Sequence, residues 1–391
     1  MLFFVYAYWH DHRFKNKVGG PIKVWELTDN LTSMGHTVFL FVPKIGFPEL
    51  QTSANIQAVP FIDFPVVRFL SFQLLSFILS LVLVARNGKP DIIYVRIMLS
   101  FIPMLLGKLF RVPVILEVND SPHRAYAGIK FNFKKKIAHL IHKISYRLCD
   151  HILPVTEKIA KDLQSVDDIP CDSMTVLPSG TNTELFRPLV KSSCHEKIGF
   201  DPTKVYVGFI GTFFQYQGID ILIDSAPSII REFSDARFLL VGDGPMRATW
   251  ERKSVKNGLS PYFIFTGLVP YKDIPLYCGI MDVCVSPLLN EARESSAVKI
   301  FDYLACGKPV VISDIEGTGR HFLASEAVIL VKPEDPSELS QAIKMLFSDS
   351  KKREEMGKKG RQFVATRYDR KKLAGDVAQL CLDIVNYRKS F

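Results

Sequence analysis

The sequence predicts an α/β protein with two Rossmann-like domains, each built on a doubly wound parallel sheet, and three observations lead to this prediction. Short apolar runs alternate with helical patterns, which is typical of β-α-β units. The alternation occurs in two successive series, and 391 residues exceed one ordinary domain. A composition of 48% hydrophobic and 23% charged residues excludes a disordered chain.

The first series contains five apolar runs that predict buried strands. These runs are 2–7, 37–42, 91–95, 113–118 and 151–155, with helical patterns between them at 21–35 and 136–148. The opening run is too short for a secretory signal, and no small-residue cleavage site follows it. We therefore expect it to form a buried first strand.

Residues 69–85 carry no charge, and seventeen residues is the lower limit for a membrane span. Gln73, Ser76 and Ser80 recur at helical spacing and form a narrow polar stripe. The next strand-like run starts at Asp91, as a β-α-β unit requires. We predict a buried or surface-docking helix rather than a transmembrane one.

The second series repeats the pattern with six strand-like runs. They are 205–210, 237–241, 262–265, 282–285, 309–312 and 327–331, and helical patterns lie at 218–232, 295–306 and 337–348. Turn-forming residues between Pro178 and Pro188 indicate a hinge. We predict an N-terminal domain over 1–187, a C-terminal domain over 188–367 facing it across a cleft, and a helix over 368–391 that crosses back to the first domain.

Glycines follow three of these strand-like runs, where doubly wound sheets bind ligands. Gly19 and Gly20 precede the first helix, Gly211 follows run 205–210, and Gly242 follows run 237–241. Each glycine taken alone is explained equally well by a tight turn. Together they indicate a phosphorylated ligand, because helix N-termini favour phosphate.

Segment 291–311 is the most informative part of the chain. Glu294 and Asp302 lie eight residues apart, with Glu294 at the entry of a helix that begins near Ser295. Such a pair alone is typical of a helix cap and a solvated acid. Here the segment follows an apolar strand and therefore starts where a ligand site is expected.

This segment resembles the E-x7-E signature of retaining nucleotide-sugar glycosyltransferases of family 4, which have the GT-B fold. Its continuation Ser296-Ala297-Val298-Lys299-Ile300-Phe301-Asp302-Tyr303 resembles the S-P-x-K-x-F-E-Y branch. Further stretches match in the family's order: Gly19-Gly20 with 34–38, 177–188, 238–245 and 265–269. The resemblance therefore spans nearly the whole chain.

The resemblance implies a role for each matching position. Asp302 would contact the nucleotide ribose, and Glu294 would face hydroxyls of the donor sugar. The backbone N–H groups of Ser295, Ser296 and Ala297 would hold phosphate or sugar. The remaining positions are glycines and neighbours that would approach the diphosphate or the base: Gly19, Gly20, Gly211, Gly242, Gly267, Leu268 and Val269.

Two departures from the family pattern concern charge. Many relatives carry Arg and Lys on the diphosphate where this chain has Thr212 and Gln217. We take Lys299 as the candidate replacement and Arg293 as the second, since such cations stabilise the charge of the leaving group. The alternative for Lys299 is an ordinary solvated helix lysine.

Asn119 stands where many relatives place a histidine near the reacting sugar. Asparagine cannot act as a base at neutral pH, but it can donate and accept hydrogen bonds. A front-face retaining reaction needs no protein nucleophile, so positioning and electrostatics suffice. We therefore keep Asn119 with Glu294 and Lys299 as the candidate catalytic residues.

The function these features favour is a retaining glycosyltransferase of surface polysaccharide or lipopolysaccharide assembly. It would use a UDP- or GDP-sugar, a glycan or lipid-linked acceptor, and no metal or other cofactor. Two alternatives stay open: a nucleotide-sugar 2-epimerase of the same fold, and a non-catalytic GT-B-like subunit of a glycosyltransferase complex. No G-x-G-x-x-G motif with a following acid supports a dehydrogenase.

The net charge of +9 indicates an anionic partner. Residues 121–149 contain seven Lys or Arg and no acid, which fits either an ordinary basic helix face or docking on anionic lipid. Only charge supports nucleic acid, so none is expected. Seven scattered cysteines without a C-x-x-C motif favour a reducing compartment. We expect a cytoplasmic protein, either free or on the inner face of the plasma membrane.

Overall fold

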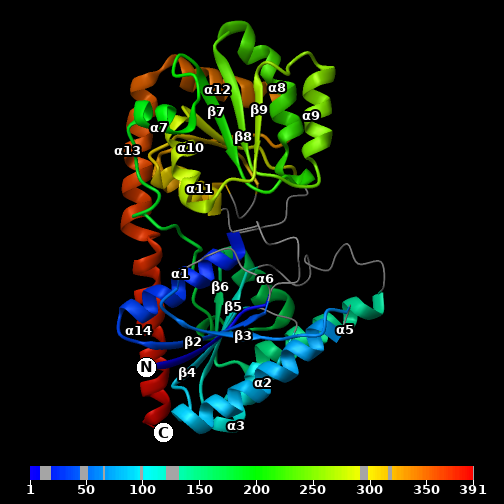
Figure 1. Ribbon diagram of the computed structural model, residues 1–391, viewed down its shortest axis with the longest axis vertical. Coiled ribbons are helices and arrows are strands. Elements are labelled where there is room, and N and C mark those ends of the chain that lie inside the picture. Colours follow the sequence, from blue (N-terminus) through cyan, green and yellow to red (C-terminus); the bar gives the residue numbers. More distant parts are fainter. Residues whose placement is uncertain are drawn as a thin grey trace. The chain divides into compact units, whose positions relative to one another are not determined.

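The computed structural model describes residues 1–8, 19–44, 52–64, 67–96, 100–119, 132–290, 298–315 and 319–390. The chain forms two compact units, Met1–Ser179 with Arg370–Phe391 (unit 1) and Gly180–Asp369 (unit 2). Each unit holds a six-stranded parallel sheet with helices on both faces (Figure 1). The predicted pair of Rossmann-like domains is confirmed.

The sheet of unit 1 has the strand order β3-β2-β1-β4-β5-β6. Its strands are β1 (Leu2–Tyr6), β2 (Thr37–Pro43), β3 (Asn55–Val59), β4 (Ile92–Arg96), β5 (Val114–Val118) and β6 (His151–Pro154). The sequence did not predict β3. This edge strand buries only Val59 fully, so it lacks an apolar run.

Alternating side chains of β1 separate two cores in unit 1. Phe3 and Val5 face the core that contains α1 (Gly19–Ser33) and α14 (Arg370–Lys389). Phe4 and Tyr6 face the second core. That core is closed by α2 (Val67–Asn87), α3 (Ile102–Phe110), α5 (Asn132–Leu148) and α6 (Glu157–Asp167).

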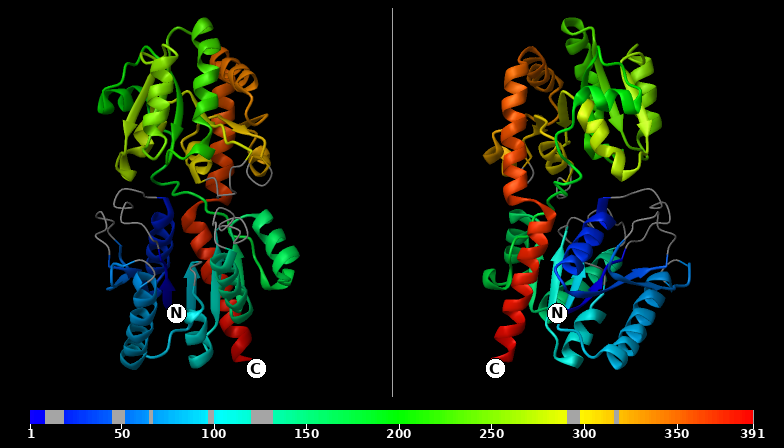
Figure 2. Two further views of the ribbon diagram at one scale, coloured as in Figure 1. Left: turned by 90° about the vertical axis from the view of Figure 1, so that its right-hand side faces the viewer. Right: turned by 60° about the vertical axis from the view of Figure 1, so that its left-hand side comes forward.

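Helix α14 follows the whole of unit 2 in sequence but packs in the core of unit 1. Figure 2 shows it running beside the sheet of unit 1. Its buried face comprises Leu373, Ala374, Val377, Ala378, Cys381 and Val385. At its start, the Arg370 guanidinium donates to Glu26 of α1 at 2.5 Å and to the carbonyl of Ser179 at 3.2 Å.

The sheet of unit 2 has the order β12-β11-β10-β7-β8-β9, which repeats the topology of unit 1. Its strands are β7 (Val205–Ile210), β8 (Ala236–Val241), β9 (Phe263–Gly267), β10 (Val283–Ser286), β11 (Val310–Ser313) and β12 (Val328–Val331). Its helices are α7 (Lys191–Ile198), α8 (Ile219–Glu232), α9 (Arg247–Lys256), α10 (Ile274–Ile280), α11 (Val298–Ala305), α12 (Pro336–Ser348) and α13 (Ser350–Arg367).

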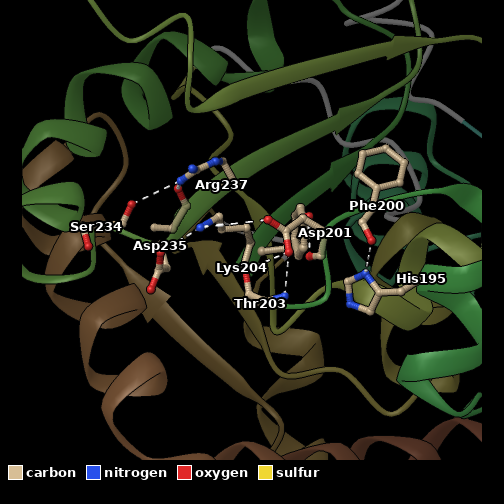
Figure 3. A network of polar contacts seen from close by, with 10 residues as sticks. His195, Phe200, Asp201, Thr203, Lys204, Ser234, Asp235 and Arg237 are labelled. Atoms are coloured by element: carbon tan, nitrogen blue, oxygen red, sulfur yellow. Dashed lines mark hydrogen bonds and ion pairs between the residues drawn. The ribbon is translucent and has the colours of Figure 1, made fainter.

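The amino-terminal edge of this second sheet is held by a polar network (Figure 3). Lys204 donates to Asp235 at 2.9 Å, and Asp201 accepts from the backbone N–H and hydroxyl of Thr203. The Nδ1 atom of His195 lies 3.1 Å from the carbonyl of Phe200. These contacts close the edge opposite to the carboxyl ends of the strands, so they belong to the scaffold.

In both sheets the strand order reverses between the first and fourth strands of the unit. Doubly wound sheets bind ligands at this reversal, outside the carboxyl ends of the strands. In unit 2 the reversal lies between β7 and β10. The glycine loop that begins at Gly211 follows β7, and α11 follows β10. The predicted donor site therefore falls at the switch point of unit 2.

Candidate functional site

The loops that follow β7 and β10 hold each other in place. The backbone N–H of Leu289 donates to the carbonyl of Tyr216 at 3.1 Å. Gly218 ends the β7 loop with a φ of +66°, and a Cβ there would lie 1.8 Å from the carbonyl oxygen of Pro287. Only glycine fits this position, because both the conformation and the close approach exclude a side chain.

Three predicted glycines form a row along the carboxyl edge of the sheet. The Gly211 N–H donates to the carbonyl of Val241, and the Gly242 N–H donates to the carbonyl of Gly267, both at 3.0 Å. A Cβ on Gly242 would lie 2.0 Å from the Gly211 carbonyl oxygen. Gly211, Gly242 and Gly267 are thus brought together at the edge where doubly wound sheets bind ligands, and the close approach of Gly242 to the Gly211 carbonyl leaves no space for a side chain.

Lys299 lies on α11 and reaches the β7 loop. Its ammonium donates to the side-chain oxygen of Gln217 and lies 4.2 Å from the centre of the Phe209 ring. A Cβ on Gly211 would be 3.3 Å from Nζ. Burial lowers the pKa of Lys299 to about 7. The alternative of an ordinary solvated lysine does not describe this side chain.

Thr212 and Gln217 occupy the two positions where many relatives carry cations. The buried Gln217 holds the Lys299 ammonium. Thr212 is half-buried and its carbonyl accepts from the N–H of Phe214 at 2.9 Å. The described part of the β7 loop therefore has one adjacent cation, which α11 supplies.

Asp302 lies one turn after Lys299 and contacts a different part of unit 2. Its Oδ1 accepts from the hydroxyl of Thr181 at 2.5 Å. The next residue, Tyr303, is fully buried, and its hydroxyl accepts from the N–H of Ile210 at 2.6 Å. Helix α11 is therefore attached both to the end of β7 and to the segment where the chain enters unit 2.

The predicted base-binding stretch follows β9. Gly267 has a φ of +74°, Leu268 is 45% exposed, and Val269 is half-buried against the core. The guanidinium of Arg247, on α9, lies beside Gly267. Ion pairs with Glu251 and Asp243, at 2.8 and 3.5 Å, raise the pKa of Arg247. The sequence analysis missed Arg247, although it follows the matched G-x-G-P stretch.

Five predicted donor-site residues lie outside the described part of the chain: Arg293, Glu294, Ser295, Ser296 and Ala297. Helix α11 is described from Val298. Within the described ranges, no group of three or more His, Cys, Asp or Glu side chains is arranged to hold a metal ion.

The candidate residues of unit 1 lie at two places. Gly19 and Gly20 are the first described residues of α1. Asn119 follows β5, and its Nδ2 atom is buried without a hydrogen-bond partner in the described part of the chain. A buried amide without a partner is uncommon in folded proteins.

A buried ion pair that the sequence analysis missed fixes α1 to β5. Lys23 donates to Glu117 at 3.0 Å, and the Tyr94 hydroxyl donates to the second oxygen of the same carboxylate. Burial alone would raise the pKa of Glu117, but Lys23 and Arg96 outweigh burial and lower that pKa. The only signal in the sequence is one acid inside an apolar strand.

Family comparisons agree with this arrangement. A family model described as "Glycosyl transferases group 1" matches residues 204–349, and one described as "Glycosyltransferase Family 4" matches residues 19–185. The first match lies within unit 2, and the second covers unit 1 from residue 19 and ends at residue 185, just inside unit 2. Both units therefore carry family features.

Three curated relatives are glycosyltransferases. The alpha-D-kanosaminyltransferase of Streptomyces kanamyceticus is 22% identical over 69% of this chain and 70% of its own length. The alpha-monoglucosyldiacylglycerol synthase of Acholeplasma laidlawii is 22% identical over 75% and 76%. A GDP-mannose-dependent phosphatidylinositol monomannoside mannosyltransferase of Mycolicibacterium smegmatis is 24% identical over 54% and 56%.

Two solved structures share the fold over almost the entire chain. The sucrose-phosphate synthase of Thermosynechococcus elongatus gives a TM-score of 0.78 at 19% identity and covers 99% of both chains. The HepE protein of Anabaena, in complex with UDP and glucose, gives 0.77 at 16% identity and covers 98% of this chain and 100% of its own. At these identities the likeness concerns the fold.

Proposed function

The chain belongs to the group 1, family 4 glycosyltransferases with the GT-B fold, and on this premise we propose that it transfers a sugar with retention of configuration. The donor is a nucleotide-diphosphate sugar, and the acceptor is a glycan or a lipid-linked saccharide of surface polysaccharide or lipopolysaccharide assembly. The observation that carries the proposal is the switch point of unit 2, where the glycine row, Lys299 and Asp302 meet.

The donor class is supported by the chemistry of this site and by the relatives. Close backbone turns suit a diphosphate, and a carboxylate suits the hydroxyls of a ribose. HepE was solved with UDP and glucose, and the mycobacterial relative is named as GDP-mannose-dependent. UDP- and GDP-sugars are therefore the donors to test first.

In the proposed reaction the bond between the anomeric carbon and the β-phosphate oxygen breaks. The acceptor oxygen bonds to the anomeric carbon on the same face, and its proton passes to the leaving phosphate oxygen. Lys299 stabilises the charge that develops on that oxygen. Glu294 and Asn119 position the reacting groups by hydrogen bonds, and neither attacks the sugar.

Ligand-induced shifts in melting temperature test the donor site. We expect stabilisation by UDP-glucose or GDP-mannose, since a ligand that binds only the folded state stabilises it. NMR of the product should show the donor's anomeric configuration. The absence of a shift with UDP, GDP, ADP and their sugars, or a product of inverted configuration, contradicts the proposal.

Measurements of donor turnover separate the two remaining alternatives. A transferase consumes donor faster when a saccharide acceptor is added. A 2-epimerase converts the donor without any acceptor, and a non-catalytic subunit does neither. Metal independence stays a prediction: turnover should persist in EDTA, and a loss that Mg²⁺ or Mn²⁺ reverses would contradict it.

We further propose that unit 1 docks on a membrane through α2. An 18-residue stretch of this helix has a mean hydropathy of 2.1, and about a quarter of that stretch is buried. The helix is therefore long and apolar enough to cross a bilayer by length and composition. An ordinary amphipathic helix buries its apolar side and exposes its polar side, whereas α2 buries its polar stripe. The polar Gln73, Ser76 and Ser80 are buried, while one apolar row is exposed: Leu70, Leu74, Ile78 and Val82.

The buried polar side chains of α2 are all satisfied inside unit 1. The Ser80 hydroxyl lies 2.6 Å from that of Tyr6, and Ser100 donates to Gln73 at 2.6 Å. Two of the three leucines of α3, Leu105 and Leu109, are exposed as well. A continuous exposed apolar row of this kind marks an interaction surface.

The charges that flank this row favour an anionic lipid surface as the partner. The described part of α5 adds Lys136, Lys143 and Arg147, and α3 adds Lys108. Basic residues near anionic lipid contribute about 1 kcal/mol each. A cytoplasmic location on the inner leaflet follows, and it would bring the enzyme to a lipid-linked acceptor.

Flotation with vesicles of phosphatidylcholine and phosphatidylglycerol tests this docking. We expect Leu74→Gln with Ile78→Gln to reduce binding about tenfold, because two exposed apolar side chains are lost. Val255→Gln, a 64% exposed apolar residue of unit 2, is the matched control and should bind normally. Wild-type protein that binds no vesicle, or binding that is unchanged in the double variant, overturns the docking proposal.

A further inference from the structure

The segment where the chain enters unit 2 contacts the predicted ribose-binding acid directly. Thr181 is fully buried, and its hydroxyl donates to Oδ1 of Asp302 at 2.5 Å across 121 residues of sequence. We infer that Thr181 is a positioning residue, whose hydroxyl orients the Asp302 carboxylate toward the ribose of the donor. The inference rests on the proposed donor site.

The Thr181 side chain is held rigidly enough for this role. Its backbone N–H donates to the carbonyl of Tyr368 at 3.0 Å, which fixes the main chain of Thr181 beside the segment where the chain leaves unit 2. A β-branched side chain has few χ1 rotamers on a fixed backbone. The hydroxyl therefore points at Asp302 before any nucleotide binds, and preorganised groups of this kind lose little entropy on binding.

The same entry segment also holds the far end of α11. The Arg361 guanidinium donates to the carbonyls of Phe186 at 2.8 Å, Thr183 at 3.1 Å and Ala305 at 3.2 Å. Ala305 is the last residue of α11. The helix that carries Lys299 and Asp302 is thus tied to segment 181–186 at two points, so its position depends on that segment.

A carboxylate that is oriented by a buried hydroxyl is suited to binding a diol. Thr181 donates one hydrogen bond to Oδ1 of Asp302, and a carboxylate offers about four acceptor positions in all. The 2′- and 3′-hydroxyls of ribose are donors that such a carboxylate can accept. Without the Thr181 hydroxyl the carboxylate loses a hydrogen bond that orients it, and discrimination between ribose and deoxyribose should decrease.

The test compares binding of UDP and GDP with that of their 2′-deoxy and 3′-deoxy analogues by calorimetry on the full chain. Wild-type protein should prefer the ribonucleotide. Thr181→Val removes the hydroxyl at nearly constant volume and should reduce this preference about tenfold, which corresponds to roughly 1.4 kcal/mol. Thr181→Ser should restore it.

Thr183→Val is the matched control. Thr183 also lies in the entry segment, and its hydroxyl donates to Asp369 at 2.5 Å without contacting Asp302. Both Thr181→Val and Thr183→Val should lower the melting temperature. Thr183→Val should leave the preference for ribose over deoxyribose intact. Adding Thr181→Val to Asp302→Asn should change the preference no further, because both substitutions act on one interaction.

The outcomes separate this inference from the function on which it rests. If wild-type protein binds no nucleotide, the donor site itself is wrong. If wild-type protein prefers ribose and Thr181→Val keeps that preference, only the role of Thr181 is overturned. A loss of preference in both Thr181→Val and Thr183→Val would show a general effect of the entry segment and would also overturn it.

Discussion

Lys299, on α11, has a pKa well below the ordinary value for lysine. Its ammonium is held by the neutral Gln217 and by the face of the Phe209 ring, and neither of these two contacts brings a negative charge to it. Desolvation then lowers its pKa to about 7. A diphosphate placed beside it would supply the missing negative charge.

The first prediction at this scale concerns pH and donor binding. Lys299 loses its proton as the pH rises through about 7, so the Kd for UDP-glucose or GDP-mannose should increase between pH 6 and pH 8. Lys299→Met should bind about tenfold more weakly at pH 6 and show a flat profile. Lys344→Met, which removes a surface lysine paired with Glu232, should keep the wild-type profile.

The low pKa of Lys299 also predicts that folding stability increases with pH, whereas donor binding weakens with pH. The folded-state pKa lies below the unfolded-state value near 10.5, so the unfolded chain binds more protons between pH 7 and pH 10.5. Folding stability should therefore increase over this interval, and the cost of burying the charge is largest below pH 7. Lys299→Met should raise the melting temperature at pH 6, and a lower melting temperature would contradict a half-buried, desolvated and charged lysine.

Single residues show where sequence reasoning was sufficient and where it was not. The resemblance to the family predicts that Gly211, Gln217 and Lys299 lie in one region, and the structure brings these three residues together. The contact between Thr181 and Asp302 was not predictable, since it depends on the path of the chain between distant segments. Glu117 was missed because its partner Lys23 lies on another element.

At the scale of elements, the β7 loop ends at a glycine, Gly218, whose conformation and surroundings both exclude a side chain. Gly218 adopts a left-handed conformation and also touches the carbonyl of Pro287. Gly258, after α9, has a similar φ of +69° but nothing within 4 Å of a Cβ. A side chain at Gly258 would therefore meet only an unfavourable backbone conformation, whereas a side chain at Gly218 would also clash with a neighbouring backbone oxygen.

The corresponding prediction compares two substitutions. Gly258→Ala should cost about 1 to 2 kcal/mol, the usual penalty of a left-handed alanine. Gly218→Ala adds a clash with a backbone oxygen, so it should cost more than ~3 kcal/mol and abolish nucleotide binding. Thermal unfolding and nucleotide titration measure both effects. Equal costs for the two variants would contradict the role assigned to Pro287.

Elements also show the limits of hydropathy patterns. The spacing of Gln73, Ser76 and Ser80 predicts that they share one face of a helix, as they do in α2. The spacing does not say whether that face is buried or exposed. The partners Tyr6 and Ser100 decide this, because they satisfy Ser80 and Gln73 inside the protein. The edge strand β3 escaped detection because four of its five residues are not fully buried.

At the scale of the whole molecule, the two units differ in how the sequence builds them. Unit 2 is one continuous segment, whereas unit 1 requires the first 179 residues and the last helix. The doubly wound topology of both was predictable from alternating strands and helices. The first boundary between the units, after Ser179, lies inside the turn-rich segment Pro178–Pro188.

Truncation after Asp369 provides a test at this scale. Removing α14 exposes the apolar side chains that it shares with α1 and takes away Arg370, the partner of Glu26. Amide hydrogen exchange should then lose protection throughout unit 1 while unit 2 keeps it. Protection that persists in unit 1 would show that α14 is peripheral. Ala374→Asp in the full chain should produce a weaker version of the same effect.

The packing of α14 also determines the order in which the chain can fold as it is synthesised. Domains usually fold in the order in which they leave the ribosome. Here the first unit to emerge cannot complete its core until all of unit 2 and α14 have followed. At about 5–20 residues per second this delay is roughly 10 to 40 s. During that time the unfinished core of unit 1 is a natural binding surface for chaperones.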